Sequence, residues 1–254
     1  MRSLLRFFGL WPYLKFLRLQ YFASPTQQDE KKLKLERIKF YEQFVTPGDL
    51  CYDIGANIGN RTEVLLALGA RVIAAEPQHE CATILRLRFG RRINVVEKAI
   101  GRTNGKAPMF ISESSEISSL SKDWIEAVSQ SRFQGKEWKV ESQVNVTTLD
   151  EIIALYGMPS FCKIDVEGFE EDVLAGLSVP IPLISLEYTI PERIENLSAC
   201  LNKLSLLGNY VCNYTIGEQT FLEQNIWVTP LELMRIIVKL STRTLFGDIY
   251  IRFV

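Results

Sequence analysis

The stretch Leu50-Cys51-Tyr52-Asp53-Ile54-Gly55-Ala56-Asn57-Ile58-Gly59-Asn60 combines three local patterns. A short apolar run ends in an acidic residue, a turn with spaced glycines follows, and residues 64–68 continue with apolar side chains in a helical pattern. Strand, tight turn and helix in this order open a βαβ nucleotide-binding unit. Glycine lets the chain turn sharply and lets a ligand approach the backbone. The stretch therefore predicts an α/β fold with a ligand site where its first strand ends.

The acidic residue before the turn indicates which nucleotide would bind. A dinucleotide-binding turn has the pattern Gly-x-Gly-x-x-Gly, because a pyrophosphate lies at the helix N-terminus. Here Asp53 precedes Gly55-x-Asn57-x-Gly59, and its carboxylate would repel a diphosphate. It would attract a cation such as the ammonium of S-adenosylmethionine (SAM), by roughly 4 kcal/mol at about 4 Å and an effective dielectric of about 20, before desolvation. The next strand ends in Glu76, where such folds place the acid that binds ribose hydroxyls.

Composition limits the classes of partner and site. The 254 residues suit one α/β domain with additions, and the net charge of −1 predicts no nucleic-acid partner. Five scattered cysteines without a Cys-x-x-Cys pair predict a reducing cytoplasm, and those at 51 and 162 are expected to be buried in strands. The single histidine, His79, leaves little material for a histidine-rich zinc site. A carboxylate is therefore the expected proton acceptor in any catalytic site.

Two amphipathic segments flank the predicted domain. Residues 1–22 are aromatic and basic, which argues against a transmembrane span and favours either contact with a membrane surface or packing on the protein. We predict an N-terminal extension (1–44), a domain (45–230) and a C-terminal extension (231–254). Segments 1–22 and 231–252 could together form one docking surface, for peripheral contact with a membrane, or a homodimer interface. Within the domain, the polar insertion 112–142 is predicted to be a lid or acceptor-binding loop.

Acidic residues recur where predicted strands end. The stretch Ser160-Phe-Cys-Lys-Ile-Asp-Val-Glu-Gly168 is again a buried strand that ends in acids before a turn, and the strand 183–188 also ends with an acid. Parallel sheets bind their ligands at the carboxyl edge of the strands. The four strand-end acids that we expect at this edge are Asp53, Glu76, Asp165 and Glu187.

Six short motifs together make the sequence similar to a known family. They are Asp53-Ile-Gly-Ala-Asn-Ile-Gly59, Ala75-Glu-Pro77, Ala99-Ile-Gly101, Ser118-Ser-Leu120, Thr148-Leu-Asp150 and Lys163-Ile-Asp-Val-Glu-Gly168. From about Val45 to Thr229 the chain resembles the FkbM family of SAM-dependent methyltransferases. The resemblance implies a class I methyltransferase (Rossmann-like) fold, with a seven-stranded, mostly parallel sheet between helices. It also implies O-methylation of a hydroxyl, often on a sugar or a polyketide-type product.

The resemblance assigns expected roles to individual residues. Asp53, Gly55, Asn57 and Gly59 are expected around the methionine moiety of SAM, and Glu76 at its ribose. Lys163, Asp165 and Glu167 are expected at the acceptor. We nominate Asp165 as the general base, with Glu167 as the alternative, and expect Lys163 to orient or neutralise the pair. Two other interpretations remain open here. Lys163 and Asp165 could form only a structural ion pair, and Asp165 with Glu187 could hold Mg²⁺.

The main hypothesis is therefore a cytoplasmic SAM-dependent O-methyltransferase that acts on a glycan, lipid-linked or small-molecule hydroxyl. An NAD-dependent oxidoreductase is a second interpretation, which the charge of Asp53 disfavours. A non-catalytic SAM-binding module is a third.

Overall fold

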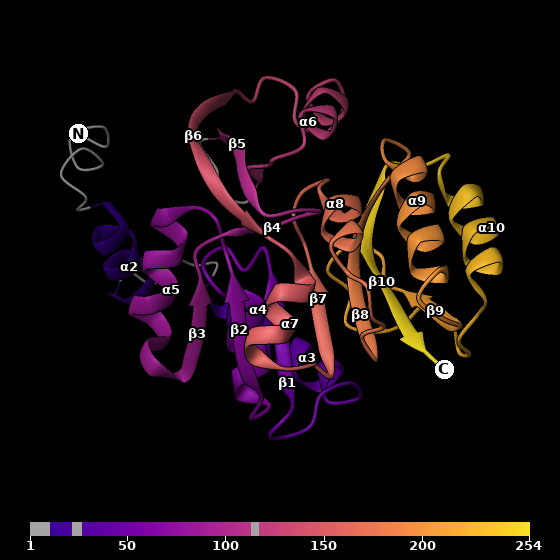
Figure 1. Cartoon of the computed structure of the whole chain (residues 1–254), viewed down its shortest axis with the longest axis horizontal. Coiled ribbons are helices and arrows are strands. Elements are labelled where there is room, and N and C mark those ends of the chain that lie inside the picture. Colours follow the sequence, from indigo (N-terminus) through magenta and orange to yellow (C-terminus); the bar gives the residue numbers. More distant parts are fainter. Residues whose placement is uncertain (1–10, 22–26, 113–116) are drawn as a thin grey trace.

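A seven-stranded sheet runs along the molecule, and a smaller sheet of three strands stands at one of its edges (Figure 1). The computed structural model describes residues 11–21, 27–112 and 117–254. The parts of the predicted N-terminal segment at 1–10 and 22, and of the predicted insertion at 113–116, lie outside the described residues. The strands are β1 (Leu50–Ile54), β2 (Arg71–Ala75), β3 (Ile93–Val96), β4 (Ala99–Ile100), β5 (Gly105–Ser112), β6 (Trp138–Thr147), β7 (Phe161–Ile164), β8 (Leu183–Ile190), β9 (Tyr210–Tyr214) and β10 (Leu245–Phe253).

The strand order confirms the predicted class of fold. The large sheet has the order β3-β2-β1-β7-β8-β10-β9, and only β10 runs antiparallel to its neighbours. The helices are α2 (Trp11–Tyr21), α3 (Gln27–Tyr41), α4 (Asn60–Ala67), α5 (His79–Phe89), α6 (Lys122–Ser129), α7 (Leu149–Tyr156), α8 (Glu170–Ala175), α9 (Ile194–Ser205) and α10 (Pro230–Leu240), with a 3-10 turn, η1 (Gly90–Arg92). A seven-stranded, mostly parallel sheet between helices is what the sequence predicted.

Helices cover both faces of the large sheet, and successive side chains of each strand point to opposite faces. On β1, Tyr52 and Ile54 belong to the apolar core beneath α7, α8, α9 and α10. Cys51 belongs to the opposite core, together with side chains of α3, α4 and α5. The five cysteines are free and buried, as predicted for Cys51 and Cys162. Asp53 therefore emerges on the α3–α4–α5 face of the sheet.

The predicted domain boundary at residue 230 is wrong. Strand β10 lies inside the large sheet between β8 and β9, and its Ile249 and Ile251 are completely buried. Helix α10 packs its buried Leu233 and Ile237 into the same core. The sequence pattern predicted one amphipathic segment over residues 231–252, whereas the structure has a helix followed by a core strand there. Between β9 and α10, an isolated antiparallel bridge joins Val228 to Cys212.

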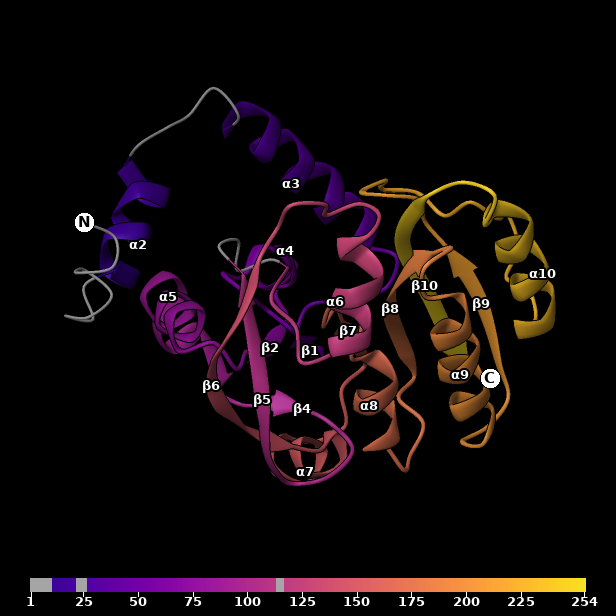
Figure 2. The ribbon, with the colours of Figure 1, turned by 90° about the horizontal axis from the view of Figure 1, so that it is seen from above.

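The N-terminal boundary at residue 44 also needs correction. Helix α3 lies on the large sheet, where Phe40 and Tyr41 make edge-to-face ring contacts with Tyr250 and Phe161. Helix α2 lies next to α5, whereas α10 lies at the other end of the molecule (Figure 2). Helices α2 and α10 therefore do not lie side by side. In the part of the chain that the structure describes, every helix is too short or too polar to cross a bilayer.

The described residues of the insertion, together with the strands that flank it, form a roof over the carboxyl edge of the large sheet (Figure 1). Strands β4, β6 and β5 make a three-stranded sheet, and helix α6 follows β5. Trp124 of α6 is 2% exposed, and a Cβ added to Gly168 would lie 2.4 Å from its side chain. The Ser119 hydroxyl donates to the carbonyl of Glu167 at 2.6 Å. These contacts join the predicted insertion 112–142 to the acidic turn after β7.

Candidate functional site

A cavity of about 590 Å³ lies between the carboxyl edge of the large sheet and the roof. The turn after β1, the acids that follow β2 and β7, and Glu187 inside β8 contribute to its wall. Met109 of β5, together with Leu120 and Trp124 of the insertion, closes it from the side of the roof. The four predicted acids therefore line one cavity, although β8 continues past Glu187 to Ile190 and this acid is not at the strand end. The acids in the wall are Asp53, Glu76, Asp165, Glu167, Glu187 and Glu218.

Gly55 brings the ends of β1 and β7 into direct contact. Its φ is +83°, and a Cβ at this position would lie 1.8 Å from the backbone oxygen of Asp165. The amide of Asp165 in turn donates to the carbonyl of Ile54 at 3.0 Å. Only glycine allows both the backbone conformation and the close approach. The turn after β1 and the acid after β7 are thus held at a defined separation.

Gly59 has a different role from the one predicted. It lies at the start of α4 with φ +90°, and a Cβ there would lie 2.4 Å from the ring of Phe89 and 2.7 Å from Leu85. It is not part of the cavity wall, whereas Gly55 and Asn57 are. Gly59 therefore allows the turn to pack against α5.

Glu76 is held in place by backbone amides at the end of β2. Its Oε2 accepts from the amide of Asn57 at 2.9 Å, and its Oε1 accepts from the amide of Gln78 at 2.8 Å. Burial raises the pKa of Glu76 to about 7, although both hydrogen bonds act in the opposite direction. This geometry fits the predicted role at a ribose diol.

Asp53 is nearly inaccessible at the cavity wall. It is 2% exposed, and the Thr62 hydroxyl donates to its Oδ2 at 2.5 Å. Burial raises its pKa, while this hydrogen bond and the charges of Lys163 and Arg61 oppose the rise. An acceptor oriented by a single hydroxyl retains capacity for a further donor. Asp53 therefore fits the predicted ammonium of SAM.

The raised pKa of Glu76 predicts how the affinity for S-adenosylhomocysteine (SAH) changes with pH. Below pH 7 the carboxyl is protonated and accepts fewer hydrogen bonds from a diol. We expect the SAH affinity to be constant above about pH 8 and to fall towards tenfold per pH unit below 7. The free energy of unfolding of the ligand-free protein changes in the opposite sense. Because the pKa of Glu76 is raised in the folded state, its protonation favours the folded form at low pH. This contribution is lost as pH rises through about 7. Titration calorimetry across pH, with Glu76→Gln as the control that flattens the profile, checks this expectation.

Three carboxyl groups meet on the side of the cavity opposite Glu76. Oxygen atoms of Asp165, Glu167 and Glu187 all lie within 4.8 Å of one another. Burial, together with the charges of Asp165 and Glu167, raises the pKa of Glu187 well above its ordinary value. Burial alone would also raise the pKa of Asp165, but the cations Lys163 and Arg61 hold it below its ordinary value. The pKa values of the two neighbouring carboxyl groups are therefore shifted in opposite directions, that of Asp165 downwards and that of Glu187 upwards.

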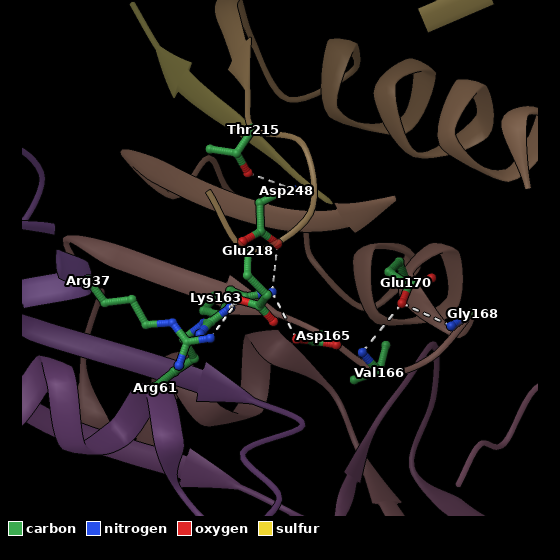
Figure 3. A network of polar contacts seen from close by, with 10 residues as sticks. All are labelled: Arg37, Arg61, Lys163, Asp165, Val166, Gly168, Glu170, Thr215, Glu218 and Asp248. Carbon is green, nitrogen blue, oxygen red and sulfur yellow. Dashed lines mark hydrogen bonds and ion pairs between the residues drawn. The ribbon is translucent and has the colours of Figure 1, made fainter. Parts of the chain in front are cut away.

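Lys163 lies behind the cavity and not in its wall. It is 1% exposed, and its Nζ lies 3.2 Å from Asp165 Oδ2 and 2.9 Å from Asp248 Oδ1 (Figure 3). Burial opposes its charge, but the two carboxylates raise its pKa well above the ordinary value. Lys163 thus orients Asp165 without reaching a ligand, which corrects its predicted place at the acceptor. Sequence reasoning missed Asp248 because it took β10 for part of an extension.

The fold and this site together define a class I SAM-dependent methyltransferase. Residues 53–236 match the family model of the methyltransferase FkbM domain. Since the match covers more than half of the chain, the protein belongs to the FkbM methyltransferase family, and its cofactor is SAM. The predicted family and cofactor are therefore confirmed.

The individual proteins that match this chain do so over a short segment or at low sequence identity. A ribosomal RNA small subunit methyltransferase A of Anaeromyxobacter dehalogenans is 40% identical over 60 residues, which are 24% of this chain and 21% of that protein. The chain thus spans about a fifth of that relative. Among solved structures, a precorrin-6y C5,15-methyltransferase of Geobacter metallireducens aligns with 11% identity over 92% of both chains (TM-score 0.45). A SAM-dependent O-methyltransferase of Thermotoga maritima aligns with 10% identity over 94% of this chain and 71% of its own (TM-score 0.40).

Proposed function

We propose that this methyltransferase transfers the methyl group of SAM to a hydroxyl oxygen, with Asp165 as the general base. The observation that carries the proposal is the acid pair in the cavity wall. The buried Lys163 lies 3.2 Å from Asp165 and lowers the pKa of that carboxyl, whereas burial raises the pKa of Glu187 beside it. A hydroxyl that reacts with a methyl sulfonium loses its proton, and an ionised carboxylate at the acceptor accepts that proton.

Different residues act at the two ends of the cavity, one of which binds the cofactor and the other the acceptor. SAM supplies an activated methyl group, so the protein needs only to align the acceptor and remove its proton. Asp53, Asn57 and Glu76 surround the end where the amino acid and ribose of the cofactor would bind. Asp165 lies across from them, at a separation set by the contact of Gly55 with its backbone. Alignment of this kind contributes several kcal/mol to catalysis, on the order of 7–11 in the best cases.

The acceptor class is the further part of the proposal. The roof supplies Trp124 and Phe133 to the same cavity that holds the acid pair. Aromatic faces beside carboxyl groups suit a polyhydroxylated ligand, whose rings stack on apolar faces while its hydroxyls bond to acids. A glycan or glycan-bearing intermediate therefore fits this side of the cavity. Membrane contact through residues 1–22 and a homodimer stay as predictions.

Transfer of a tritiated methyl group from SAM into fractionated extract of the source cells tests the proposal. We expect label in a carbohydrate-containing fraction, released as volatile methyl iodide by hot hydriodic acid, which cleaves methyl ethers. Label that resists this cleavage, or that becomes soluble with nuclease, would contradict O-methylation of a glycan. Excess EDTA in the same assay examines the Mg²⁺ alternative at Asp165 and Glu187, because a metal-dependent transfer would stop.

A further inference from the structure

Two arginines from different helices converge on one carboxylate at the cavity (Figure 3). Arg37 of α3 and Arg61 of α4 place their Nη2 atoms 2.6 Å and 2.8 Å from the same oxygen, Oε2 of Glu218. Both arginine side chains are largely buried, whereas the Glu218 side chain is 50% exposed. All three residues belong to the cavity wall. The arginines therefore form a preorganised cationic pair beside the ligand space.

Glu218 accepts hydrogen bonds from only some of the N–H donors of Arg37 and Arg61. Two guanidinium groups share one oxygen, and the Nε atoms of Arg37 and Arg61 are buried without a hydrogen-bond partner among the described residues. Each guanidinium offers five N–H donors in a fork that matches a carboxylate. A buried donor without a partner destabilises the folded protein. The pair thus has donors and charge for a second anion, and the bound Glu218 shows that a carboxylate is the anion that fits.

The position of Arg61 indicates which carboxylate this is. Arg61 lies in the first turn of α4, directly after the glycine turn, and its charge acts on Asp53 in the same cavity wall. A carboxylate beside a guanidinium is complementary to the ammonium and carboxylate that an α-amino acid carries on one carbon. The other side of the cavity, with Asp165, Glu167 and Glu187, would repel an anionic acceptor.

We propose that Arg37 and Arg61 bind the methionine carboxylate of SAM while Asp53 binds its ammonium. The inference rests on the proposed function only in taking SAM as the ligand of this cavity. It adds a residue from outside the family-matched region 53–236, because Arg37 belongs to helix α3. Helix α3 thus completes the cofactor site, in addition to covering the sheet.

Comparison of SAM with decarboxylated SAM isolates the carboxylate. The two ligands share the adenosine, sulfonium and ammonium groups, so only the proposed contact differs between them. In titration calorimetry of the full chain, we expect Arg61→Gln to weaken SAM binding by about 10–100-fold and to leave the affinity for decarboxylated SAM unchanged. Arg37→Gln should act in the same direction, and Arg61→Lys should restore part of the affinity because it keeps the charge and loses the fork.

Decarboxylated SAM also controls for folding, because its unchanged affinity shows an intact cavity in each variant. Lys98→Gln is the matched control, since Lys98 lines the same cavity beyond Glu76 and should affect both ligands equally. Equal losses for both ligands in Arg61→Gln and Arg37→Gln, or no loss for either, would overturn the inference. Unchanged affinities with a raised KM for the acceptor would overturn it too, and would assign the arginines to the acceptor. Wild-type protein that binds neither ligand would overturn the proposed function as well.

Discussion

Replacing Asp165 by asparagine is expected to lower turnover by about 10²–10⁴-fold, the usual contribution of a general base. The affinity for SAH should stay within a few-fold, because Asp165 lies across the cavity from the cofactor end. Asparagine keeps the size of the side chain and an oxygen that can accept from Lys163. The charge of Lys163 remains paired with Asp248 at 2.9 Å, so the fold is expected to persist. Single-turnover methyl transfer and SAH titration of the same preparation measure the two quantities separately.

Three further variants show whether the loss of turnover is specific to Asp165. Glu167→Gln decides between the two nominated bases, because only loss of the true base produces the large effect. Glu187→Gln imitates the protonated state of Glu187 and should retain most of the turnover. Asp172→Asn removes a carboxylate that pairs with Arg102 at the surface, and it should leave both quantities unchanged. Wild-type turnover in Asp165→Asn, or loss of SAH binding in that variant, would refute the assignment.

A single methyl group at Gly55 is expected to damage both stability and the site. In Gly55→Ala the new Cβ would lie 1.8 Å from the Asp165 backbone oxygen, at a φ of +83°. The left-handed conformation costs about 1–2 kcal/mol and overpacking about 1–3 kcal/mol. Together they correspond to a fall in melting temperature of roughly 5–20 °C for a domain of this size. SAH binding should be lost as well, because β1 and β7 would have to separate.

Gly48→Ala separates the two causes of this effect. Gly48 has a similar φ of +92°, but a Cβ there would meet nothing within 4 Å. We therefore expect only the conformational cost of about 1–2 kcal/mol, with SAH affinity unchanged. Differential scanning calorimetry of the two variants, with and without SAH, gives the comparison. Equal losses of stability in both variants would show that the contact with Asp165 contributes nothing.

Much of the site was predictable because it depends on short stretches of chain. The strand, turn and helix at residues 50–67 follow from an apolar run, glycine positions and helical spacing, which act over a few residues. The acids at the ends of β1, β2 and β7, and Glu187 within β8, could be placed at one edge because parallel strands share their direction. The buried cysteines followed from the same apolar runs. Gly59 was the exception, since spacing does not distinguish a glycine that faces a ligand from one that faces a helix.

The errors share a different physical origin, which is contact between distant residues. No local pattern shows that β10 lies between β8 and β9, because strand neighbours are selected by packing across the whole chain. For that reason Asp248, the second partner of Lys163, was missed, and Lys163 was placed in the cavity. Arg37 and Glu218 are 181 positions apart, so their meeting with Arg61 was equally hidden.

By itself, the sequence determined the class of fold, the family, the cofactor and the acids available for chemistry, because these depend on residue types within short segments. Only the tertiary structure decided in which direction each acid's pKa is shifted, which cation lies behind Asp165 and which helices complete the cavity. Charge state depends on burial and on neighbours within a few ångströms, and in a folded chain most such neighbours come from elsewhere in the sequence.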